Sequence, residues 1–362
     1  MALFRNGEGV AVLRVSLAFQ EGPAEAGVAR VLRDLALERM RSLARPVAAR
    51  VRAEPTPRGF AFQVEGSEPD FEYLAYILRR GLADPGPGDV SLAAARRELN
   101  RELDRELETP RGRLARSIRE ALPPGFAPPE VTQGTLASLD AGRVREAWAR
   151  LRATGDARLV VSVPAAPEVV LAAAGGLPRR GAGPLPLDAP PPPSAAPEEP
   201  QTLRWWYAVA WPVDRRWAAA ADVAVRLAGS LLKETAERFP LYLEVWDLPG
   251  GLVFVVSGAA YRRDRRAMEG AVDEFVAHLR SRISAGEVAR AAAAAQRDLL
   301  LAARSPQGLV ASFGRAADDG DSWTPDALWE AAYALGSVSA ADVGALLDHL
   351  LARSPLHARV NP

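Results

Sequence analysis

The sequence has no cysteine and only three histidines, His278, His349 and His357, all in its last quarter. Without cysteine the chain can form neither disulfides nor thiolate zinc sites nor iron–sulfur clusters, and it offers no cysteine nucleophile. Three histidines near one end of the chain also make a histidine-rich metal site difficult to build. The sequence therefore predicts no cofactor bound by this chain itself.

Lysine is almost absent as well, because Lys233 is the only one and arginine supplies the other basic side chains. Lys233 follows no glycine-rich loop, so the sequence has no phosphate-binding motif built on a lysine. The 45 basic residues are balanced by 45 acidic ones. A nucleic-acid-binding protein needs a surplus of positive charge to neutralise phosphates, so we expect no nucleic-acid partner.

Long apolar segments are missing too. Residues 10–19 are mostly apolar, but they alternate with polar residues and contain Arg14, whereas a signal peptide needs a continuous apolar stretch. No segment reaches the roughly 20 apolar residues of a membrane-spanning helix. We therefore expect a cytoplasmic protein with no membrane partner.

The sequence otherwise has the composition of a folded globular protein. Of its 362 residues, 48% are apolar and 25% charged, and this length favours about two domains. Residues 176–200 are rich in proline and include four consecutive prolines, Pro190 to Pro193. Proline runs favour an extended, semi-rigid spacer. We therefore predict an N-terminal domain over residues 1–175, a linker over 176–200 and a C-terminal domain over 201–362.

The two halves contain matching segments. Residues 108–112 (ETPRG) correspond to 304–308 (RSPQG), and residues 136–140 (LASLD) correspond to 335–339 (LGSVS). The matches occur in the same order, which favours a duplicated unit. Asp140 and Ser339 are both suitable N-caps for the helix that follows.

The order of the predicted elements also repeats. Strands over residues 10–19 and 203–213 are each followed by a helix, then by a hairpin, then by several helices. The halves end with strands over 158–163 and, more weakly, 357–360. Strands followed by runs of helices indicate an α+β fold, with helices packed on an antiparallel or mixed sheet.

A specific arrangement surrounds the first helix. The loop over residues 20–26 (QEGPAEA) follows the first strand, Gly27 begins the helix, and residues 30–34 read RVLRD. A second helix, over 98–108, is rich in Glu and ends before a Thr-Pro pair. This order resembles the pitrilysin/insulinase-type zinc peptidases, most closely the short-chain branch that includes the mitochondrial processing peptidase. The resemblance covers nearly the whole chain and implies two homologous units that form half of a peptidase clam.

The zinc motif of that family is degenerate in this sequence. Members of the family carry His-x-x-Glu-His on the first helix, where two histidines bind zinc and the glutamate activates a water. Arg30, Arg33 and Asp34 stand at these three positions. Arginine is permanently protonated and is neither a zinc ligand nor a general base, and Asp34 alone cannot hold zinc. The resemblance therefore implies that the zinc belongs to another chain.

Glu102 matches the position of the family's third zinc ligand, eight residues before Pro110. Two interpretations stay open for it. The first is a solvated helix face with charge pairs one turn apart. The second is a salt bridge from Arg30 or Arg33 to Glu102, which would fill the vacated metal site.

Arg238 and Tyr242 are the candidate substrate-binding residues. In non-catalytic chains of such two-chain peptidases, an Arg and a Tyr before the second hairpin reach towards the partner's active site, and Arg238 and Tyr242 resemble that pair. Arg238 would donate hydrogen bonds to a substrate carbonyl, and Tyr242 would donate one more. The alternative is that Tyr242 is a structural strand aromatic and Arg238 a basic residue at a helix C-terminus.

Trp205 and Trp206 begin the strand predicted for the second half, and neighbouring residues of a strand face opposite ways. One of the two rings is therefore either under the helices or at an interface, and the alternatives are a core residue and a residue of a chamber wall or subunit contact.

The resemblance implies a bacterial-type, non-catalytic subunit of a heterodimeric zinc metallopeptidase that acts in peptide processing. A homologous partner with an intact His-x-x-Glu-His would bind the zinc, and the substrates would be unstructured peptides. The alternatives are a binding or scaffold protein of the same fold, and an enzyme that uses other chemistry.

Overall fold

The computed structural model describes residues 2–19, 21, 25–56, 59–83, 89–154, 157–164, 167–174, 205–236, 238–319 and 326–361. Contacts divide the chain into two compact units, each built on one β-sheet. The units take segments from both halves of the sequence. The first includes Leu300–Leu328, and the second includes Asp104–Ala127. The predicted linker over 176–200 lies outside the described residues, and the repeat boundaries at 175 and 201 stay predictions.

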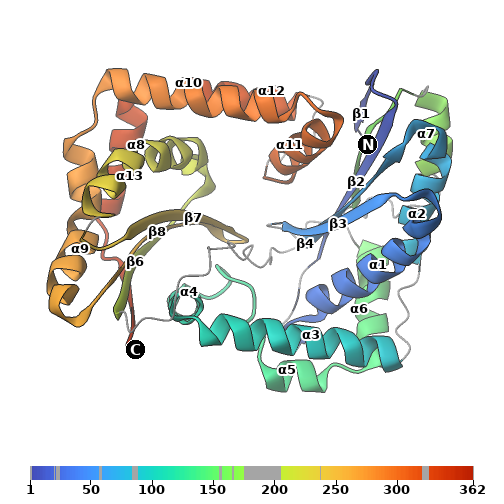
Figure 1. Ribbon diagram of the computed structural model, residues 1–362, viewed down its shortest axis with the longest axis horizontal. Coiled ribbons are helices and arrows are strands. Elements are labelled where there is room, and N and C mark those ends of the chain that lie inside the picture. The colour runs from blue at the N-terminus through green and yellow to red at the C-terminus, as the bar shows by residue number, and fades with distance from the viewer. Residues whose placement is uncertain are drawn as a thin grey trace. The chain divides into compact units, whose positions relative to one another are not determined.

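The first unit holds a five-stranded sheet in the order β1-β5-β2-β4-β3 (Figure 1). Its strands are β1 (Ala2–Phe4), β2 (Val10–Ala18), β3 (Arg50–Thr56), β4 (Gly59–Ser67) and β5 (Ala157–Ser162). The pair β1–β5 is parallel and the other pairs are antiparallel. The sequence predicts β2, the hairpin of β3 and β4, and β5, but not β1, which is too short to show a period.

Helices cover both faces of this sheet. They are α1 (Val28–Ala44), α2 (Phe71–Ala83), most of α3 (Asp89–Glu108), α5 (Gln133–Ser138), α6 (Ala141–Thr154), α7 (Pro167–Ala174) and α11 (Pro306–Asp319). Leu13, Val15 and Leu17 of β2 point into the main core with α1 and α2. Helix α11 contacts β2 and β5, and its Gly314 lies against Arg14 on the alternate face of β2. Because both faces are covered, β2 is buried along almost its whole length.

Arg14 is the largest buried charged side chain, with 1% of its surface exposed. Its guanidinium forms an ion pair with Glu54 of β3. Gly314 leaves the space that the Arg14 side chain fills, because a Cβ at residue 314 would overlap it. The charge in this mostly apolar strand is therefore accommodated by a carboxylate on β3 and a glycine on α11.

The second unit holds an antiparallel four-stranded sheet in the order β7-β8-β6-β9. Its strands are β6 (Trp205–Val213), β7 (Leu241–Leu248), β8 (Gly251–Ala260) and β9 (Leu356–Val360). Its helices are α4 (Pro110–Ala121), α8 (Ala218–Ala236), α9 (Arg265–Ser281), most of α10 (Ala285–Ala302), most of α12 (Ala327–Gly336) and α13 (Ala340–Leu351).

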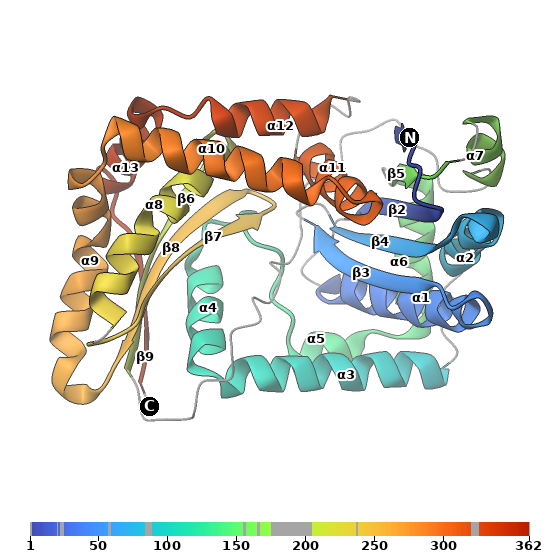
Figure 2. The same cartoon turned by 45° about the horizontal axis from the view of Figure 1, so that its top comes forward.

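The two faces of β6 belong to different cores. Tyr207, Val209 and Trp211 pack with α8, α9 and α13, whereas Trp206 and Ala208 pack with α4, which contacts β6 and β9 (Figure 2). The guanidinium of Arg265 lies 4.2 Å from the ring centroid of Trp205 at the start of α9. The two neighbouring tryptophans therefore face opposite ways, as predicted, and Trp206 is a core residue.

The matching segments of the sequence form similar turns, each of which connects two helices. Helix α4 follows α3, and α11 follows α10, each after a Ser or Thr N-cap with proline as the first helical residue. The amide of Gly112 donates to Thr109 Oγ1 at 3.0 Å, and the amide of Gly308 donates to Ser305 Oγ at 3.1 Å. A Cβ at either glycine would overlap a backbone carbonyl oxygen of the preceding helix. The sequence match thus reflects a shared backbone requirement.

The predicted caps at the second matching segment are also present. Asp140 Oδ1 accepts from the amide of Arg143 at 2.8 Å, before α6. Ser339 Oγ accepts from the amide of Asp342 at 3.2 Å, before α13, and the Asp342 carboxylate accepts from the amide of Ser339. Both caps satisfy amides at a helix N-terminus that have no partner within the helix.

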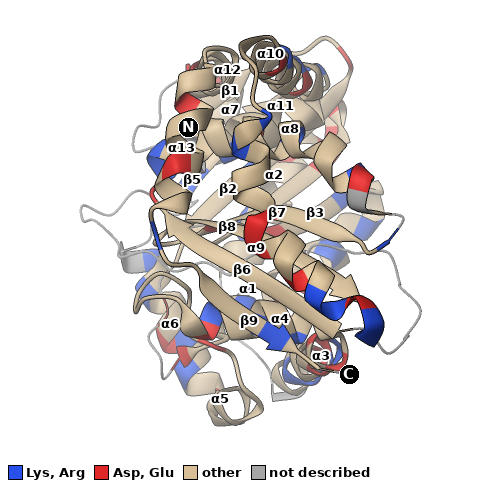
Figure 3. Cartoon of the chain, turned by 90° about the vertical axis from the view of Figure 1, so that its left-hand side faces the viewer, with Lys and Arg blue, Asp and Glu red and all other residues tan. Residues whose placement is uncertain are grey.

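Acidic and basic residues are interspersed over α9, and β9 carries a single charged residue, Arg359 (Figure 3). Arg265 donates to Glu269 at 2.9 Å, and Arg359 lies 3.8 Å from the same carboxylate. Within the described ranges, no single helix is long and apolar enough to span a membrane, and only the pair α12 and α13, bent by 86°, meets that test together.

Candidate functional site

The degenerate zinc positions lie on α1, whose start is held by Glu21. The carboxylate of Glu21, which is 8% exposed, accepts the amide of Gly27 at 3.2 Å and also that of Ala29. Gly27 has φ of 96°, a left-handed conformation that suits glycine. The sequence pattern located this helix start correctly, and the acidic residue before it supplies the N-terminal cap.

Arg33 and Asp34 form an ion pair with each other. Arg33 Nε donates to Asp34 Oδ1 at 2.8 Å, and the terminal nitrogen of Arg33 lies 2.8 Å from the same oxygen. The two side chains are 19% and 24% exposed. The Asp34 carboxylate, which is the only possible metal ligand among Arg30, Arg33 and Asp34, is therefore already neutralised by Arg33.

Glu102 on α3 lies within the electrostatic reach of the same residues. Burial raises the pKa of Glu102 above its ordinary value, and the charge of Asp34 raises it further, while the charges of Arg33 and Arg30 lower it. The structure therefore brings all four degenerate positions into one electrostatic neighbourhood. A direct salt bridge from either arginine to Glu102 stays a prediction.

This neighbourhood does not fit zinc. Arginine carries no lone pair for a metal, and two guanidinium groups repel a divalent cation. Over the part of the chain that the structure describes, no group of three or more His, Cys, Asp or Glu side chains could hold a metal ion. No catalytic step through zinc can therefore be built on these residues.

We expect that three substitutions would restore a zinc site here. The triple variant Arg30→His, Arg33→Glu, Asp34→His recreates the family motif beside Glu102 and should bind about one zinc per chain, whereas the unmodified chain should bind none. Metal content after dialysis against zinc, measured by mass spectrometry, tests this. Adding Glu102→Gln to the triple variant should lower zinc affinity about tenfold or more. A folded triple variant without zinc would show that these positions do not converge.

Arg238 and Tyr242 lie on the second unit but make different contacts. Arg238, in the turn before β7, is 63% exposed and donates to Asp264 Oδ1 at 3.2 Å. The Tyr242 ring, on β7, stacks on Trp206 with centroids 5.9 Å apart. Tyr242 is thus a partly buried strand aromatic, which agrees with the structural alternative for its ring. Whether either residue reaches a substrate stays a prediction.

The structure also places Arg111 beside Tyr242. The guanidinium of Arg111, on the first turn of α4, lies 5.4 Å from the centroid of the Tyr242 ring and forms an ion pair with Glu244. Trp246 Nε1 donates to the other oxygen of Glu244 at 2.9 Å. We call Arg111, Tyr242, Glu244 and Trp246 the β7 cluster. In the sequence, Arg111 appears only within the repeated segment, so only the packing of α4 on the sheet could reveal it.

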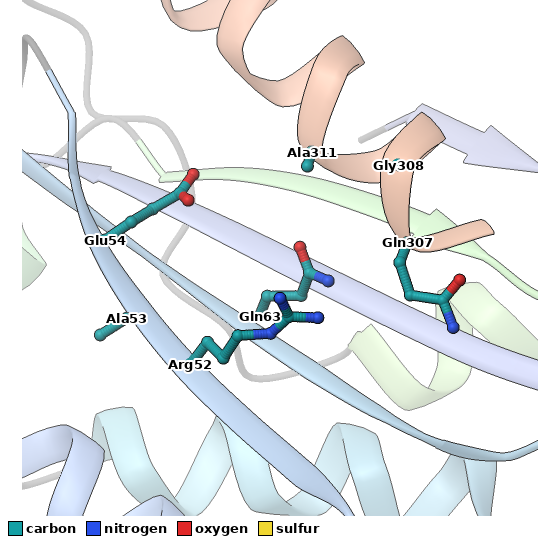
Figure 4. Close-up of a pocket in the computed structure, with 7 residues that line it drawn as sticks. All are labelled: Arg52, Ala53, Glu54, Gln63, Gln307, Gly308 and Ala311. Carbon is teal, nitrogen blue, oxygen red and sulfur yellow. The ribbon is translucent and has the colours of Figure 1, made fainter. Parts of the chain in front are cut away.

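A small polar cavity of about 180 Å³ lies in the first unit beneath the start of α11 (Figure 4). Its lining includes Arg52, Glu54, Gln63 and Gln307. Glu65 binds both Arg52, at 3.2 Å, and Gln307, at 3.0 Å, and Glu54 pairs with Arg14. The charged groups around this cavity are therefore paired with one another. The hydrogen bond from Gln307 to Glu65 connects α11 to the sheet.

No protein-family model and no curated protein matches the sequence. Solved structures do resemble it. A protease from Helicobacter pylori has a TM-score of 0.76 at 11% identity, over 96% of this chain and 92% of that one. A peptidase M16 inactive domain from Pseudomonas fluorescens has a TM-score of 0.76 at 12% identity, over 96% and 92%. The periplasmic protease PqqL from Escherichia coli has a TM-score of 0.74 at 14% identity, over 99% of this chain and 43% of that one.

The chain has the fold of these peptidases. The predicted fold class, α+β with two units that share one order of strands and helices, is thereby confirmed. The chain spans less than half of PqqL but nearly all of the other two. At such low identities the likeness concerns the peptidase fold alone, and activity has to be argued from the residues of the site.

Proposed function

We propose that this chain is the non-catalytic subunit of a heterodimeric zinc peptidase of the pitrilysin/insulinase type. A homologous partner with an intact His-x-x-Glu-His binds the zinc, the attacking water and the general base. This chain closes the chamber and binds part of an unstructured peptide substrate. We propose a bacterial cytoplasmic location for the pair.

The observation that carries the proposal is a peptidase fold whose zinc position holds an Arg33–Asp34 ion pair. The helix on which the family carries its motif begins at the left-handed Gly27 and is capped by Glu21 in this chain. Arg30, Arg33 and Asp34 on this helix do not provide metal-binding chemistry. This combination favours a chain that contributes a binding surface to a peptidase but does not catalyse the cleavage itself.

The β7 cluster supports a role in binding peptide. β7 is an edge strand of its sheet, and exposed strand edges accept extended peptides through backbone hydrogen bonds. On the sheet face beside this strand lie the guanidinium of Arg111 and the ring of Tyr242, which stacks on Trp206 of β6, and Arg238 lies just before the strand begins. Guanidinium and phenol groups are hydrogen-bond donors suited to peptide carbonyls.

Exposed aromatic residues on α12 support the presence of a protein partner. Trp329 is 61% exposed and Tyr333, one turn later, is 74% exposed. Tryptophan and tyrosine are enriched in protein–protein interfaces, where they contribute much of the binding energy. Two of them on one helix face favour an interface over a freely solvated surface.

Co-expression with a homologous chain that carries the intact zinc motif tests the proposal. We expect a stable heterodimer that cleaves unstructured peptides, while each chain alone turns over at least about a hundredfold more slowly. The measurements are size-exclusion chromatography and cleavage of a fluorogenic peptide library.

Three outcomes would contradict the proposal. A partner that is fully active alone would make this chain a scaffold or regulator of the same fold. Turnover by this chain alone, without bound metal, would instead require an enzyme with other chemistry. The absence of any complex would also favour the scaffold.

A further inference from the structure

A second cavity, of about 410 Å³, lies on the second unit where β6 ends. This volume is within the usual range of small-molecule sites, about 300–1,000 Å³. Apolar side chains line part of it, including Pro123, Phe126 and Pro212. None of these residues belongs to the β7 cluster or to the degenerate zinc positions. The cavity is therefore separate from the surfaces discussed above.

Two arginines give this cavity its charge. Arg216, in the short turn after β6, and Arg353, just after α13, both line it. Neither guanidinium pairs with a carboxylate anywhere in the described ranges. The neighbouring Arg215 is different, because it pairs with Asp247 at 2.8 Å and also binds the carbonyl of Leu248. The cavity thus has two cationic groups that the fold leaves available.

Asp214 is the one carboxylate in the lining, and it already has a local role. Its Oδ1 accepts the amide of Arg216 at 2.8 Å as the cap of the turn. The guanidinium of Arg216 meanwhile lies 5.2 Å from the centroid of the Trp217 ring. The Arg216 side chain is therefore held by an aromatic face, an arrangement that leaves its hydrogen-bond donors open to a ligand.

The imidazole of His349, on α13, also lines this cavity and senses the charges of the two arginines. Its ring lies 5.7 Å from that of Trp217, centroid to centroid. Burial lowers the pKa of His349 below its ordinary value, and the charges of Arg353 and Arg216 lower it further. The imidazole is consequently neutral at pH 7, and its titration senses any negative charge that enters the cavity.

We propose that this cavity binds a carboxylate carried on an apolar group, such as the C-terminal residue of a peptide that ends in an aromatic or aliphatic side chain. Arg216 and Arg353 bind the carboxylate through charge-assisted hydrogen bonds. Phe126 and the two prolines contact the apolar part. The site belongs to this chain alone and does not depend on the zinc-bearing partner, so it is tested separately from the proposed function.

The test uses the purified full chain with N-acetylphenylalanine as the probe. The chain has three histidines, and the variant His349→Gln assigns the His349 imidazole signal in the NMR spectrum. We expect saturable shifts of this signal with a Kd of about 1 mM or below. The bound carboxylate should raise the pKa of His349, because its charge offsets those of the two arginines. Binding should therefore tighten as the pH falls through the range in which His349 becomes protonated.

Matched ligands and variants give the controls. N-acetylphenylalaninamide keeps the ring but lacks the carboxylate, and it should bind about tenfold more weakly or worse. Arg216→Gln and Arg353→Gln should each weaken binding about tenfold. Both arginines are exposed, so these variants should fold normally. Arg266→Gln, on the exposed surface of α9 outside the cavity, should bind like the unmodified chain.

Three results would overturn the proposal. One is the lack of any saturable shift of His349 up to about 20 mM probe. The second is equal binding of the acid and the amide. The third is inorganic phosphate binding as tightly as N-acetylphenylalanine, because the cavity would then be a general anion site without selection for an apolar group.

Discussion

Gly308→Ala is expected to destabilise the chain by about 2–4 kcal/mol, which lowers the Tm of the affected unit by about 5–10 °C. Gly308 lies in the first turn of α11, and its missing side chain lets this helix start directly against the end of α10. An alanine Cβ would overlap the carbonyl oxygen of Ala302. That oxygen belongs to the backbone of α10, so a side-chain rotation cannot relieve the overlap. Thermal unfolding followed by circular dichroism measures the effect.

Other glycines in the chain supply matched comparisons. Gly112→Ala should cost a similar amount, because a Cβ there would overlap the carbonyl oxygen of Glu106. Gly229 and Gly270, inside α8 and α9, have nothing within 4 Å of the point that a Cβ would occupy. Alanine at either site should stabilise the chain by about 0.5–1 kcal/mol through helix propensity. If alanine at 308 and 112 behaved like alanine at 229 and 270, the two helix corners would not have the described geometry.

Tyr242→Phe is expected to lower the turnover of the proposed heterodimer by about 10–100-fold without dissociating it. Removal of a single donor to developing oxyanion charge has effects of this order or larger. The substitution keeps the ring that stacks on Trp206 and under Arg111, so folding and assembly should be unaffected. Steady-state kinetics of the pair should show the loss in kcat, and size-exclusion chromatography should show an intact complex.

Arg238→Ala should act in the same direction as Tyr242→Phe. Its pairing with Asp264 is exposed and contributes little to stability. Tyr261→Phe removes a hydroxyl from an exposed tyrosine outside the β7 cluster and should leave turnover unchanged. Unchanged turnover in both Tyr242→Phe and Arg238→Ala would remove these two residues from the substrate site, while a pair that remained active would keep the subunit assignment.

The sequence predicted local structure well because local rules decide it. Apolar patterning located β2 and β6 to within a few residues, and the caps at Asp140 and Ser339 are present. Strand β1 was missed because three residues carry no usable period. The repeated ETPRG and RSPQG segments proved to be helix corners, since both require a capping hydroxyl, a proline and a glycine in a fixed order.

The candidate site was less accessible to sequence reasoning. That Arg30, Arg33 and Asp34 cannot hold zinc follows from residue chemistry alone, but the ion pair between Arg33 and Asp34 depends on side-chain geometry. Arg111 reaches Tyr242 only because α4, encoded in the first half, packs on the sheet of the second. No spacing in the sequence predicts a contact between such distant segments.

The sequence by itself thus determined the α+β class, the duplicated order of elements and the inability of the first helix to bind zinc. These features depend on periodicity, capping and the donor atoms of single side chains. The tertiary structure decided that α4 belongs to the unit of the second sheet and α11 to the unit of the first, that Arg14 is buried against Gly314, and that Arg216 and Arg353 line one cavity. These features depend on which faces of the sheets and helices pack together to bury apolar surface. That packing involves segments from the whole chain, so no local pattern in the sequence decides it.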